Sequence, residues 1–478
     1  MTYYLDPYGC VKNQVDAENM MAALNETGWA AAENAENADL IIVNSCAFIE
    51  SAKKESINAV LIWRKLYPKK RILLAGCLVQ RYAKELPEIL PEADGFFGLD
   101  DPGGIAKAVT RIIGFGVVKT MKAAANAPPL PGGRPLLSLP GSAYVKISEG
   151  CDNRCSFCAI PLIRGGLKSR TPEDIIEECK TLLGRGIKEL CLIGQDTSSY
   201  GMDSWRGLHT PVQDGVCNPS PIPYENNIPR CSAAGYVDLT SGGLPGLMES
   251  LSKLIGDFWV RTLYIHPDHF PLPILDIMES DKRFLPYFDV PFQHASEKIL
   301  KAMNRRGNAE TYLGLIETLR RRLEDAVIRT TFMTGFPGET EEDFALLLDF
   351  QKKARLDWAG CFAYSREENT PAYKLKGQVA KKTAAERKQL IEEEQISISE
   401  KQMERFVRRT LNVLVEEKFD TREPSTGETD LYLGRLPCQA PEVDGSTVIF
   451  TSTPLKIGTI VPCRIVASAG IDLEAQPL

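Results

Sequence analysis

The sequence lacks the features of a membrane protein or a secreted protein. No uninterrupted apolar run reaches the length needed to span a bilayer. The first ten residues, MTYYLDPYGC, contain no basic segment followed by an apolar one, so we expect no signal peptide. The 13 cysteines do not form a short disulfide framework. We therefore expect a protein of the reducing cytoplasm, where clustered cysteines more often bind metals or take part in catalysis.

The sequence also lacks an excess of positive charge. It has 56 Lys and Arg against 63 Asp and Glu, a net charge of −7, which argues against binding a phosphate backbone by bulk electrostatics. With 44% hydrophobic and 25% charged residues, the composition is that of an ordinary globular protein. A chain of 478 residues leaves room for about three domains.

Three cysteines lie close together in the segment 150–170, GCDNRCSFCAIPLIRGGLKSR. Cys151, Cys155 and Cys158 have CxxxCxxC spacing, and the aromatic Phe157 precedes the last of them. A 4Fe–4S cluster normally takes four Cys ligands, so a cluster on three would leave one iron open to chelate a substrate. The alternative is a zinc knuckle, which requires four ligands, but no fourth Cys or His lies near. The pattern resembles the signature of radical S-adenosylmethionine (AdoMet) enzymes.

Residues 1–125 alternate strand-like apolar runs with helical patterns, which predicts a parallel sheet. Three of the strand runs end at Cys10, Cys46 and Cys77. Ligands of an open parallel sheet gather beyond the carboxyl ends of its strands, so these cysteines could share an edge and bind a second cluster. The alternative is three unconnected buried cysteines, and the residues alone leave both interpretations open.

A second α/β domain is predicted at residues 141–408, after a semi-rigid linker at 126–140 that is rich in Pro, Ala and Gly. It contains six strand candidates, at 143–148, 188–194, 260–266, 286–292, 326–333 and 358–364. Six βα units predict a partial (βα)6 barrel of the TIM type, with its chemistry at the carboxyl ends of the strands. The CxxxCxxC loop follows the first of these strands.

Residues 203–242 interrupt this pattern, because Pro, Gly, Asn and Ser dominate and no period appears. We interpret them as a long surface loop that could alter access to the site, and we expect no role for Cys217 and Cys231 within it. The remaining cysteines are expected in the core: Cys179, Cys191, Cys361, Cys438 and Cys463.

Several residues near the predicted strand ends are candidates for contact with a cofactor. Gln195 and Asp196 follow the second strand, and Gly335, Pro337 and Gly338 follow the fifth. The alternatives are a loop cap for the first pair and a simple turn for the other three. Three basic residues at 164–170 could bind anionic groups or form a solvated charge run. Ordinary hydrogen-bonded side chains are expected for the three histidines in this domain, His266, His269 and His294.

The end of the chain predicts a charged helix at 381–408 and then a small β-barrel of the oligonucleotide-binding type at 409–478. Such barrels often bind RNA, but from Leu411 onward this one has 5 basic and 10 acidic residues, which favours a basic protein as partner. One acidic stretch is a candidate for steering that partner, or else forms a solvated turn: Glu416, Glu417, Asp420 and Glu423.

The order of these features resembles the methylthiotransferases over nearly the whole chain, apart from 203–242. The family has two branches: MiaB modifies an adenosine of transfer RNA, and RimO modifies an aspartate of small-subunit ribosomal protein S-twelve. Local segments such as CVKNQVDAE, ISEGCDNRCSFC, IGQDTSSYG and YSREENTPA are similar to the RimO branch, and the acidic barrel agrees with a basic protein substrate. The tRNA alternative predicts a basic barrel.

The resemblance implies an N-terminal methylthiotransferase domain, a radical AdoMet core and a terminal barrel of the TRAM type. It implies two 4Fe–4S clusters, one on Cys151, Cys155 and Cys158 and one on the three N-terminal cysteines. AdoMet would serve as radical source and as methyl donor. The second cluster would carry the sulfur, and no side-chain acid or base is required. The partners implied are the ribosomal protein, an electron donor and a sulfur donor, with no membrane.

Overall fold

The computed structural model describes residues 1–99, 104–115, 118–121, 133–203, 242–419 and 430–478. Within these ranges, no helix is long and apolar enough to cross a membrane. The chain forms two compact units. The first comprises Met1–Gly166, Glu177–Gln195 and Ser365–Lys376, and the second comprises Leu167–Ile176, Asp196–Tyr364 and Gly377–Leu478. Both groups of cysteines that the sequence singles out belong to the first unit.

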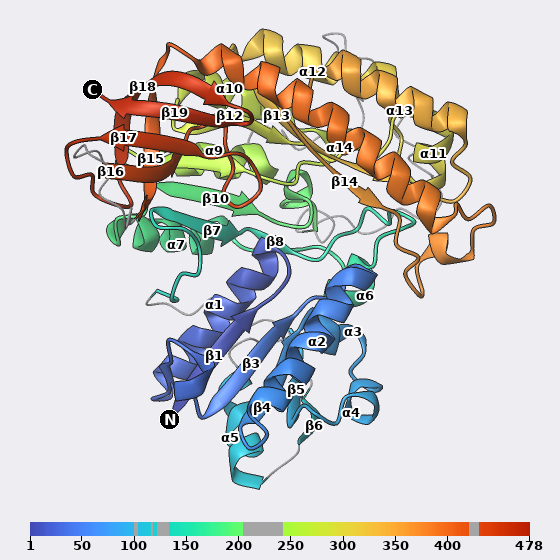
Figure 1. Cartoon of the computed structure of the whole chain (residues 1–478), viewed down its shortest axis with the longest axis vertical. Helices are drawn as coiled ribbons and strands as arrows, with labels where there is room; N and C mark the ends of the chain where they lie inside the picture. The colour runs from blue at the N-terminus through green and yellow to red at the C-terminus, as the bar shows by residue number, and fades with distance from the viewer. Residues whose placement is uncertain (100–103, 116–117, 122–132, 204–241, 420–429) are drawn as a thin grey trace, which may run out of the picture. The chain divides into compact units, whose positions relative to one another are not determined.

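The N-terminal part of the first unit contains a parallel sheet, as predicted (Figure 1). Its strands are β1 (Thr2–Pro7), β2 (Ala30–Ala31), β3 (Leu40–Ser45), β4 (Arg71–Gly76), β5 (Gly95–Phe97) and β6 (Val118–Met121). They lie in the order β2-β1-β3-β4-β5-β6. Asn44 pairs with Ala75 and Ser45 with Gly76, so β3 and β4 end level with each other.

Helices cover both faces of this sheet. They are α1 (Val11–Glu26), α2 (Glu50–Leu66), α3 (Cys77–Arg81), α4 (Leu86–Ile89) and α5 (Ile105–Phe115). Ile42 and Leu73 face the core built with α1 and α5, whereas their neighbours Ile41 and Leu74 face the core on the other side of the sheet, built with α2, α3 and α4. Burial on both faces explains why these strands are continuous apolar runs.

The second sheet has all six strands that the sequence predicts. They are β7 (Ser142–Lys146), β10 (Glu189–Ile193), β11 (Trp259–Thr262), β12 (Phe284–Asp289), β13 (Val327–Thr334) and β14 (Trp358–Ala363). The order β14-β13-β12-β11-β10-β7 has two free edges, so the barrel is incomplete, as expected. A short two-stranded sheet, β8 (Ser148–Glu149) with β9 (Lys168–Ser169), flanks the CxxxCxxC loop.

The helices associated with the second sheet follow most of its strands, which is the βα pattern read from the sequence. They are α6 (Ile160–Arg164), α7 (Pro172–Gly184), α9 (Gly243–Ser252), α10 (Ile274–Ser280), α11 (Glu297–Ala302), α12 (Ala309–Arg322), α13 (Glu341–Ala354) and α14 (Lys381–Met403). The last of these is the predicted charged helix.

The C-terminal residues form a closed five-stranded barrel in the order β15-β16-β17-β19-β18. Its strands are β15 (Thr410–Phe419), β16 (Asp430–Arg435), β17 (Thr447–Thr451), β18 (Ile460–Ala469) and β19 (Asp472–Pro477). The sequence predicts the first four from the runs LNVLVEE, YLGRLP, STVIF and GTIVPCRIVAS, but not β19, whose sequence DLEAQP has weak strand propensity. Pairing with β18 on one side and β17 on the other makes this last segment a strand.

The predicted linker is partly anchored. Residues 122–132 lie outside the described part of the chain, but Arg134 is buried in the first unit. Its Nε atom lies 2.6 Å from Glu18, and it also pairs with Glu178. Buried ion pairs of this kind hold the end of the linker against α1 and α7, and the semi-rigid linker stays a prediction for the part that lies outside the described residues.

Candidate functional site

The three N-terminal cysteines follow three adjacent strands. Cys10 follows β1 by three residues, and Cys46 and Cys77 directly follow β3 and β4. The backbone N–H of Tyr8 donates to the carbonyl of Asn44 over 2.9 Å, which brings the turn after β1 against the end of β3. A β-carbon placed on Gly9 would lie 3.5 Å from the Cys46 sulfur. The expectation that one sheet edge brings these cysteines together agrees with this arrangement.

A polar frame holds this edge in place. The side chain of Asn13 donates to the carbonyl of Ser45 over 3.1 Å, and that of Asn44 donates to the carbonyl of Asn13 over 2.8 Å. Gly76 has a φ of +97°, and a β-carbon there would lie 2.8 Å from the Ser45 carbonyl oxygen. Only glycine fits this turn, and the turn starts α3 with Cys77 as its first residue.

The thiols at this edge interact electrostatically with one another. The pKa of Cys77 is raised to about 12, chiefly by burial and in smaller part by Cys10 and Cys46, while Arg164 opposes the shift. Burial likewise raises the pKa of Cys46, with Cys10 adding to the effect. Because the thiolate is the metal-binding form, a bound cation is needed to ionise these thiols at neutral pH.

The CxxxCxxC loop is a compact backbone turn. Gly150 has a φ of +71°, and a β-carbon there would lie 2.1 Å from the carbonyl oxygen of Gly166. Backbone hydrogen bonds join Cys151 to Gly165 over 3.2 Å and Cys158 to Cys155 over 3.1 Å. The three loop cysteines are partly exposed, whereas Cys46 and Cys77 are buried. Local backbone contacts therefore fix the loop that carries these three cysteines.

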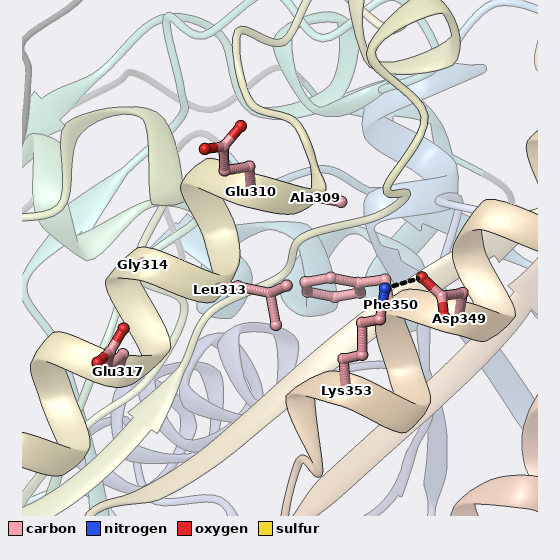
Figure 2. Close-up of a pocket in the computed structure, with 8 residues that line it drawn as sticks. All are labelled: Ala309, Glu310, Leu313, Gly314, Glu317, Asp349, Phe350 and Lys353. Carbon is pink, nitrogen blue, oxygen red and sulfur yellow. Dashed lines mark ion pairs between the residues drawn. The ribbon is translucent and has the colours of Figure 1, made fainter.

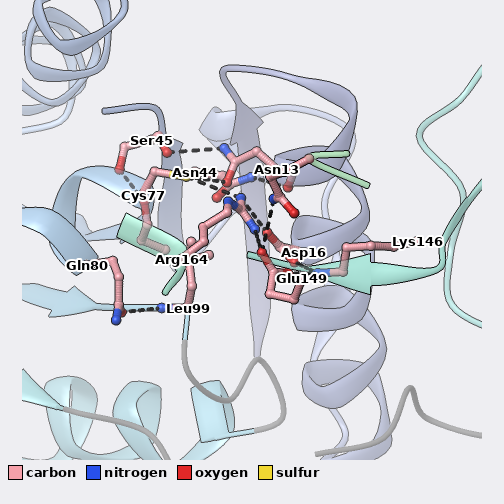
Figure 3. A network of polar contacts seen from close by, with 12 residues as sticks. Asn13, Asp16, Asn44, Ser45, Cys77, Gln80, Leu99, Lys146, Glu149 and Arg164 are labelled. Atoms are coloured by element: carbon pink, nitrogen blue, oxygen red, sulfur yellow. Dashed lines mark hydrogen bonds and ion pairs between the residues drawn. The ribbon is translucent and has the colours of Figure 1, made fainter. Parts of the chain in front are cut away.

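A buried charged network connects the surroundings of the two cysteine groups (Figure 3). Arg164, at the end of α6, donates to Glu149 over 2.8 Å, to Asp16 over 2.9 Å and to the Cys77 sulfur over 3.2 Å. Lys146 lies 2.5 Å from Asp16 and 2.6 Å from Glu149. Asp16 lies on the helix that follows Cys10, and Glu149 precedes the CxxxCxxC loop by one residue.

Within this network, the opposite charges shift each other's pKa toward the ionised form. Burial alone would raise the pKa of Glu149, but Arg164 and Lys146 outweigh it and hold that pKa well below its ordinary value. Burial opposes the charge of Arg164, yet Cys77, Glu149 and Asp16 raise its pKa. Lys146, Glu149 and Arg164 therefore remain ionised at neutral pH.

The segment Ser365–Lys376, which we call the strap, makes a second set of contacts within the first unit. Glu367 is buried and pairs with Lys53 at 2.9 Å and with Arg81 at 2.7 Å. Further along, the N–H of Ala372 donates to the carbonyl of Ser156, inside the CxxxCxxC loop, over 2.8 Å. The strap thus contacts both the N-terminal sheet region and the loop.

No three or more His, Cys, Asp or Glu side chains converge on a single metal ion within the ranges described. A four-iron cluster makes a different demand, because its cysteines bind different irons. All six predicted ligands carry free thiols, in two groups of three. The donor set therefore fits two clusters rather than an isolated ion.

The other predicted cofactor contacts occupy the strand ends. Gln195 donates to Glu149 over 3.2 Å, while its buried Oε1 atom has no hydrogen-bond partner among the described residues. Asp196 accepts from the N–H of Ser198 and caps the short helix Thr197–Ser199, so its capping alternative is confirmed. Phe157 is partly buried in the loop.

The glycines after the fifth strand form a turn that leads into α13. The N–H of Gly335 donates to Glu339 over 2.8 Å, and that of Gly338 donates to the carbonyl of Gly377 over 2.8 Å. Pro337 lies between them in this turn. Their turn alternative is therefore confirmed, and a role toward AdoMet remains a prediction.

The remaining predictions about single residues have mixed outcomes. The three histidines are hydrogen-bonded, His266 to the N–H of Asp268, His269 to Asp196 and His294 to the N–H of Ser296. The five expected core cysteines are buried. Cys217 and Cys231 lie outside the described residues. Of the basic segment, Lys168 is exposed, but the side chain of Arg164 is only 2% exposed, so the solvated interpretation is wrong for Arg164.

The steering role predicted for the acidic stretch of the terminal barrel is wrong for Glu416. Glu416 is only 3% exposed, and its carboxylate accepts from Nε of Arg435 over 2.8 Å. Glu416 lies where the register between β15 and β16 shifts, between Val415 and Glu417, and its side chain is buried against Arg435. It therefore cannot steer a partner. Glu417 is exposed, whereas Asp420 and Glu423 lie outside the described residues.

A shallow hollow of about 450 Å³ lies between α12 and α13 in the second unit (Figure 2). It is lined by Ala309, Glu310, Leu313, Gly314, Glu317, Asp349, Phe350 and Lys353. Lys353 pairs with Asp349 at 2.7 Å. The lining contains no cysteine or histidine, and we assign it no chemistry.

Sequence reasoning missed the charged residues that surround the cysteines: Asp16, Lys146, Glu149 and Glu367. A signal was present for Asp16. In the helix after Cys10, polar residues stand among the apolar ones instead of gathering on a separate face, so some of them, including Asp16, are buried. No comparable signal marked Glu367, whose partners Lys53 and Arg81 are 314 and 286 residues away in the sequence. Nor did one mark Glu149, although Lys146 and Arg164 are only 3 and 15 residues away.

Family models match three parts of the chain. Residues 2–98 match the family described as uncharacterized protein family UPF0004, residues 145–350 the radical SAM superfamily and residues 407–478 the TRAM domain. A solved structure, the radical S-adenosylmethionine methyltransferase TsrM from Kitasatospora setae with cobalamin and a 4Fe–4S cluster bound, has a TM-score of 0.52. It covers 78% of this chain and 76% of its own at 12% identity, so the likeness is one of fold.

Curated relatives match over nearly the full length. A protein of Treponema denticola named ribosomal protein uS12 methylthiotransferase RimO is 46% identical, covering 98% of this chain and 99% of that protein. A protein of the same name from Syntrophomonas wolfei is 39% identical, covering 98% of each chain.

Proposed function

This chain belongs to the RimO family of ribosomal protein uS12 methylthiotransferases, and we propose that it adds a methylthio group to the β-carbon of an aspartate in that ribosomal protein. It is a radical AdoMet enzyme with two 4Fe–4S clusters. The observation that carries the proposal for this chain is the presence of two separate groups of three cysteines in one compact unit, each at the carboxyl ends of parallel strands.

We assign Cys151, Cys155 and Cys158 to the cluster that binds AdoMet, and Cys10, Cys46 and Cys77 to the second cluster. Both groups supply three thiols, so each cluster keeps one iron available for another ligand. When bound, the clusters and AdoMet supply the one-electron chemistry and the sulfur site that conversion of an unactivated C–H bond requires.

The chain's own residues position these groups. The tight turn at Gly150 starts the loop that carries three of the cysteines, and the ends of β1, β3 and β4 hold the other three at one edge. The buried network around Arg164 supplies fixed charges between these surroundings, where water is largely excluded. No side chain needs to act as acid or base in this scheme.

Among the candidate AdoMet contacts, Gln195 is the best supported. Its amide nitrogen binds Glu149, which directly precedes Gly150 and the loop, and its buried Oε1 atom has no protein partner among the described residues. A buried acceptor of this kind requires a partner, and a bound cofactor supplies one. Phe157, Asp196, Gly335, Pro337 and Gly338 are proposed as surrounding contacts.

The reaction also requires a one-electron donor and a source of sulfur, and we propose that both act in the cytoplasm together with the ribosomal protein. The terminal barrel favours this substrate over tRNA, because it has more acidic than basic residues. The exposed Glu417 belongs to that acidic surface.

Mass spectrometry of cells with and without the gene tests the proposal. We expect a methylthio group on an aspartate of uS12 only when the gene is present, and no change in tRNA. Methylthiolated adenosine that depends on this gene, with unmodified uS12, would overturn the assignment in favour of the tRNA branch.

A further inference from the structure

Arg164 differs from the other residues around the two cysteine groups, because it contacts parts of both. Its side chain is 2% exposed. It donates to the sulfur of Cys77 over 3.2 Å, which belongs to the N-terminal group. It also donates to Glu149 over 2.8 Å, which adjoins the CxxxCxxC loop, as Figure 3 shows.

The contact between Arg164 and the sulfur is not needed to balance the charge of the guanidinium. Arg164 and Lys146 carry two positive charges, and Asp16 and Glu149 carry two negative ones, within ion-pair distance of each other. A buried cation requires such compensation, and it is complete without Cys77. One N–H donor of Arg164 is therefore available for the Cys77 sulfur, which it contacts over 3.2 Å.

We infer that Arg164 is a positioning residue of the second iron–sulfur site, which orients the Cys77 sulfur and raises the reduction potential of the cluster held there. The inference rests on the ligand set of the proposed function. A hydrogen bond to a cluster sulfur and a nearby positive charge both favour the reduced state, which carries one more negative charge. The bonds to Asp16 and Glu149 fix the guanidinium in its orientation.

The test uses the full-length chain with Cys151, Cys155 and Cys158 changed to Ala, so that only the second cluster remains. This parent protein is reconstituted anaerobically, its iron is counted, and its midpoint potential is measured by redox titration monitored by electron paramagnetic resonance. The same measurements are made after adding Arg164→Gln, Arg164→Lys or Arg134→Gln. Arg134 is the matched control, because it is a buried, ion-paired arginine that binds Glu18 and Glu178.

We expect about four irons in the parent and in all three variants. The midpoint potential should fall in Arg164→Gln, which loses both the charge and the donor. It should fall less in Arg164→Lys, which keeps the charge but not the forked geometry. Arg134→Gln should leave the potential unchanged.

An unchanged potential in an Arg164→Gln protein that retains its four irons overturns the inference. If both Arg164 variants lose the cluster while Arg134→Gln retains it, the orientation of Cys77 depends on Arg164, which supports positioning. If Arg134→Gln loses the cluster as well, the effect is general destabilisation, and the inference fails. A parent protein without iron contradicts the proposed ligand set itself, which is a result distinct from an unchanged potential.

Discussion

The two groups of cysteines reach similar chemistry by opposite structural routes. Cys151, Cys155 and Cys158 lie within eight residues, in one loop that follows the tight turn at Gly150. Cys10, Cys46 and Cys77 are separated by 36 and 31 residues, and the order of β1, β3 and β4 brings them to one edge. A local group depends on its own loop, whereas a dispersed group depends on the register of a whole sheet.

The two routes also create different surroundings for the thiols. The loop cysteines are partly exposed, but Cys46 and Cys77 are buried, and burial raises the pKa of both. The dispersed group therefore needs positive charge nearby, which Arg164 supplies at the Cys77 sulfur. When thiols lie at strand ends within a core, the charged side chains beside them come from segments that are distant in the sequence.

The largest expected effect comes from removing the local group. Changing Cys151, Cys155 and Cys158 to Ala should abolish AdoMet cleavage and product formation, because the cluster that binds AdoMet is lost. The iron content should fall from about eight to about four per chain. Iron analysis and chromatography of the cleavage products check this, and unchanged iron would contradict the assignment.

Removing the dispersed group should separate the two roles. With Cys10, Cys46 and Cys77 changed to Ala, about four irons should remain and AdoMet should still be cleaved, but no methylthio product should form. The reason is that the sulfur has lost its site while the radical chemistry has not. Methylthiolated uS12 produced by this variant would show that the sulfur is carried elsewhere.

Removing the charge that anchors the strap should lower the stability of the protein rather than its catalytic activity directly. Changing Glu367 to Gln leaves Lys53 and Arg81 without their buried partner, which should cost about 3–5 kcal/mol. Thermal unfolding of this variant and of Glu368→Gln, an exposed neighbour, measures the effect. Equal melting temperatures for the two variants would mean that the strap is not held by Glu367.

The contribution of Glu367 should also depend on pH. Although burial opposes it, hydrogen bonds from Ser365, Lys53 and Arg81 hold the pKa of Glu367 below its ordinary value of 4.5. A lowered folded-state pKa stabilises the protein above pH 4.5, and this stability is lost as the pH falls through the lowered pKa. Wild type should thus lose more stability on acidification than Glu367→Gln does.

Glycine substitutions compare the two routes directly. Gly150→Ala and Gly76→Ala each force a β-carbon against backbone atoms, at 2.1 Å and 2.8 Å, and each should cost at least about 1–3 kcal/mol. The first should lower the occupancy of the loop cluster, and the second that of the N-terminal cluster. Gly184→Ala, where a β-carbon meets nothing within 4 Å, is the control. The effect is measured by counting iron in two parent proteins, one without Cys10, Cys46 and Cys77 and the other without Cys151, Cys155 and Cys158.

The smallest effect is expected at the surface of the terminal barrel. Glu417→Gln should weaken binding of uS12 only slightly, by about 0.2–1 kcal/mol, and the loss should shrink as salt is raised. Glu416→Gln should instead lower barrel stability, since it leaves the buried Arg435 without its carboxylate. Binding measured at two salt concentrations, together with thermal unfolding, distinguishes the two neighbours.

Much of the architecture could be predicted from the sequence because it depends on local patterns. The apolar runs of β3 and β4, the six strands of the partial barrel and the CxxxCxxC loop all have short-range signatures. The strand β19 was missed, because its residues form a strand only through pairing with β17 and β18. The burial of Glu416 was missed because the side-chain direction along β15 depends on the closed barrel.

By itself, the sequence determined which residues can bind iron, since thiol chemistry and spacing are properties of the chain. It also determined the family, through motifs spread along nearly its whole length. Only the tertiary structure decided that the ends of β1, β3 and β4 are adjacent, and that Arg164 contacts Asp16, Glu149 and Cys77. Contacts such as those of Arg164 with Cys77 and Asp16, 87 and 148 residues away, leave no local pattern, because the fold, not the neighbouring sequence, sets their distances.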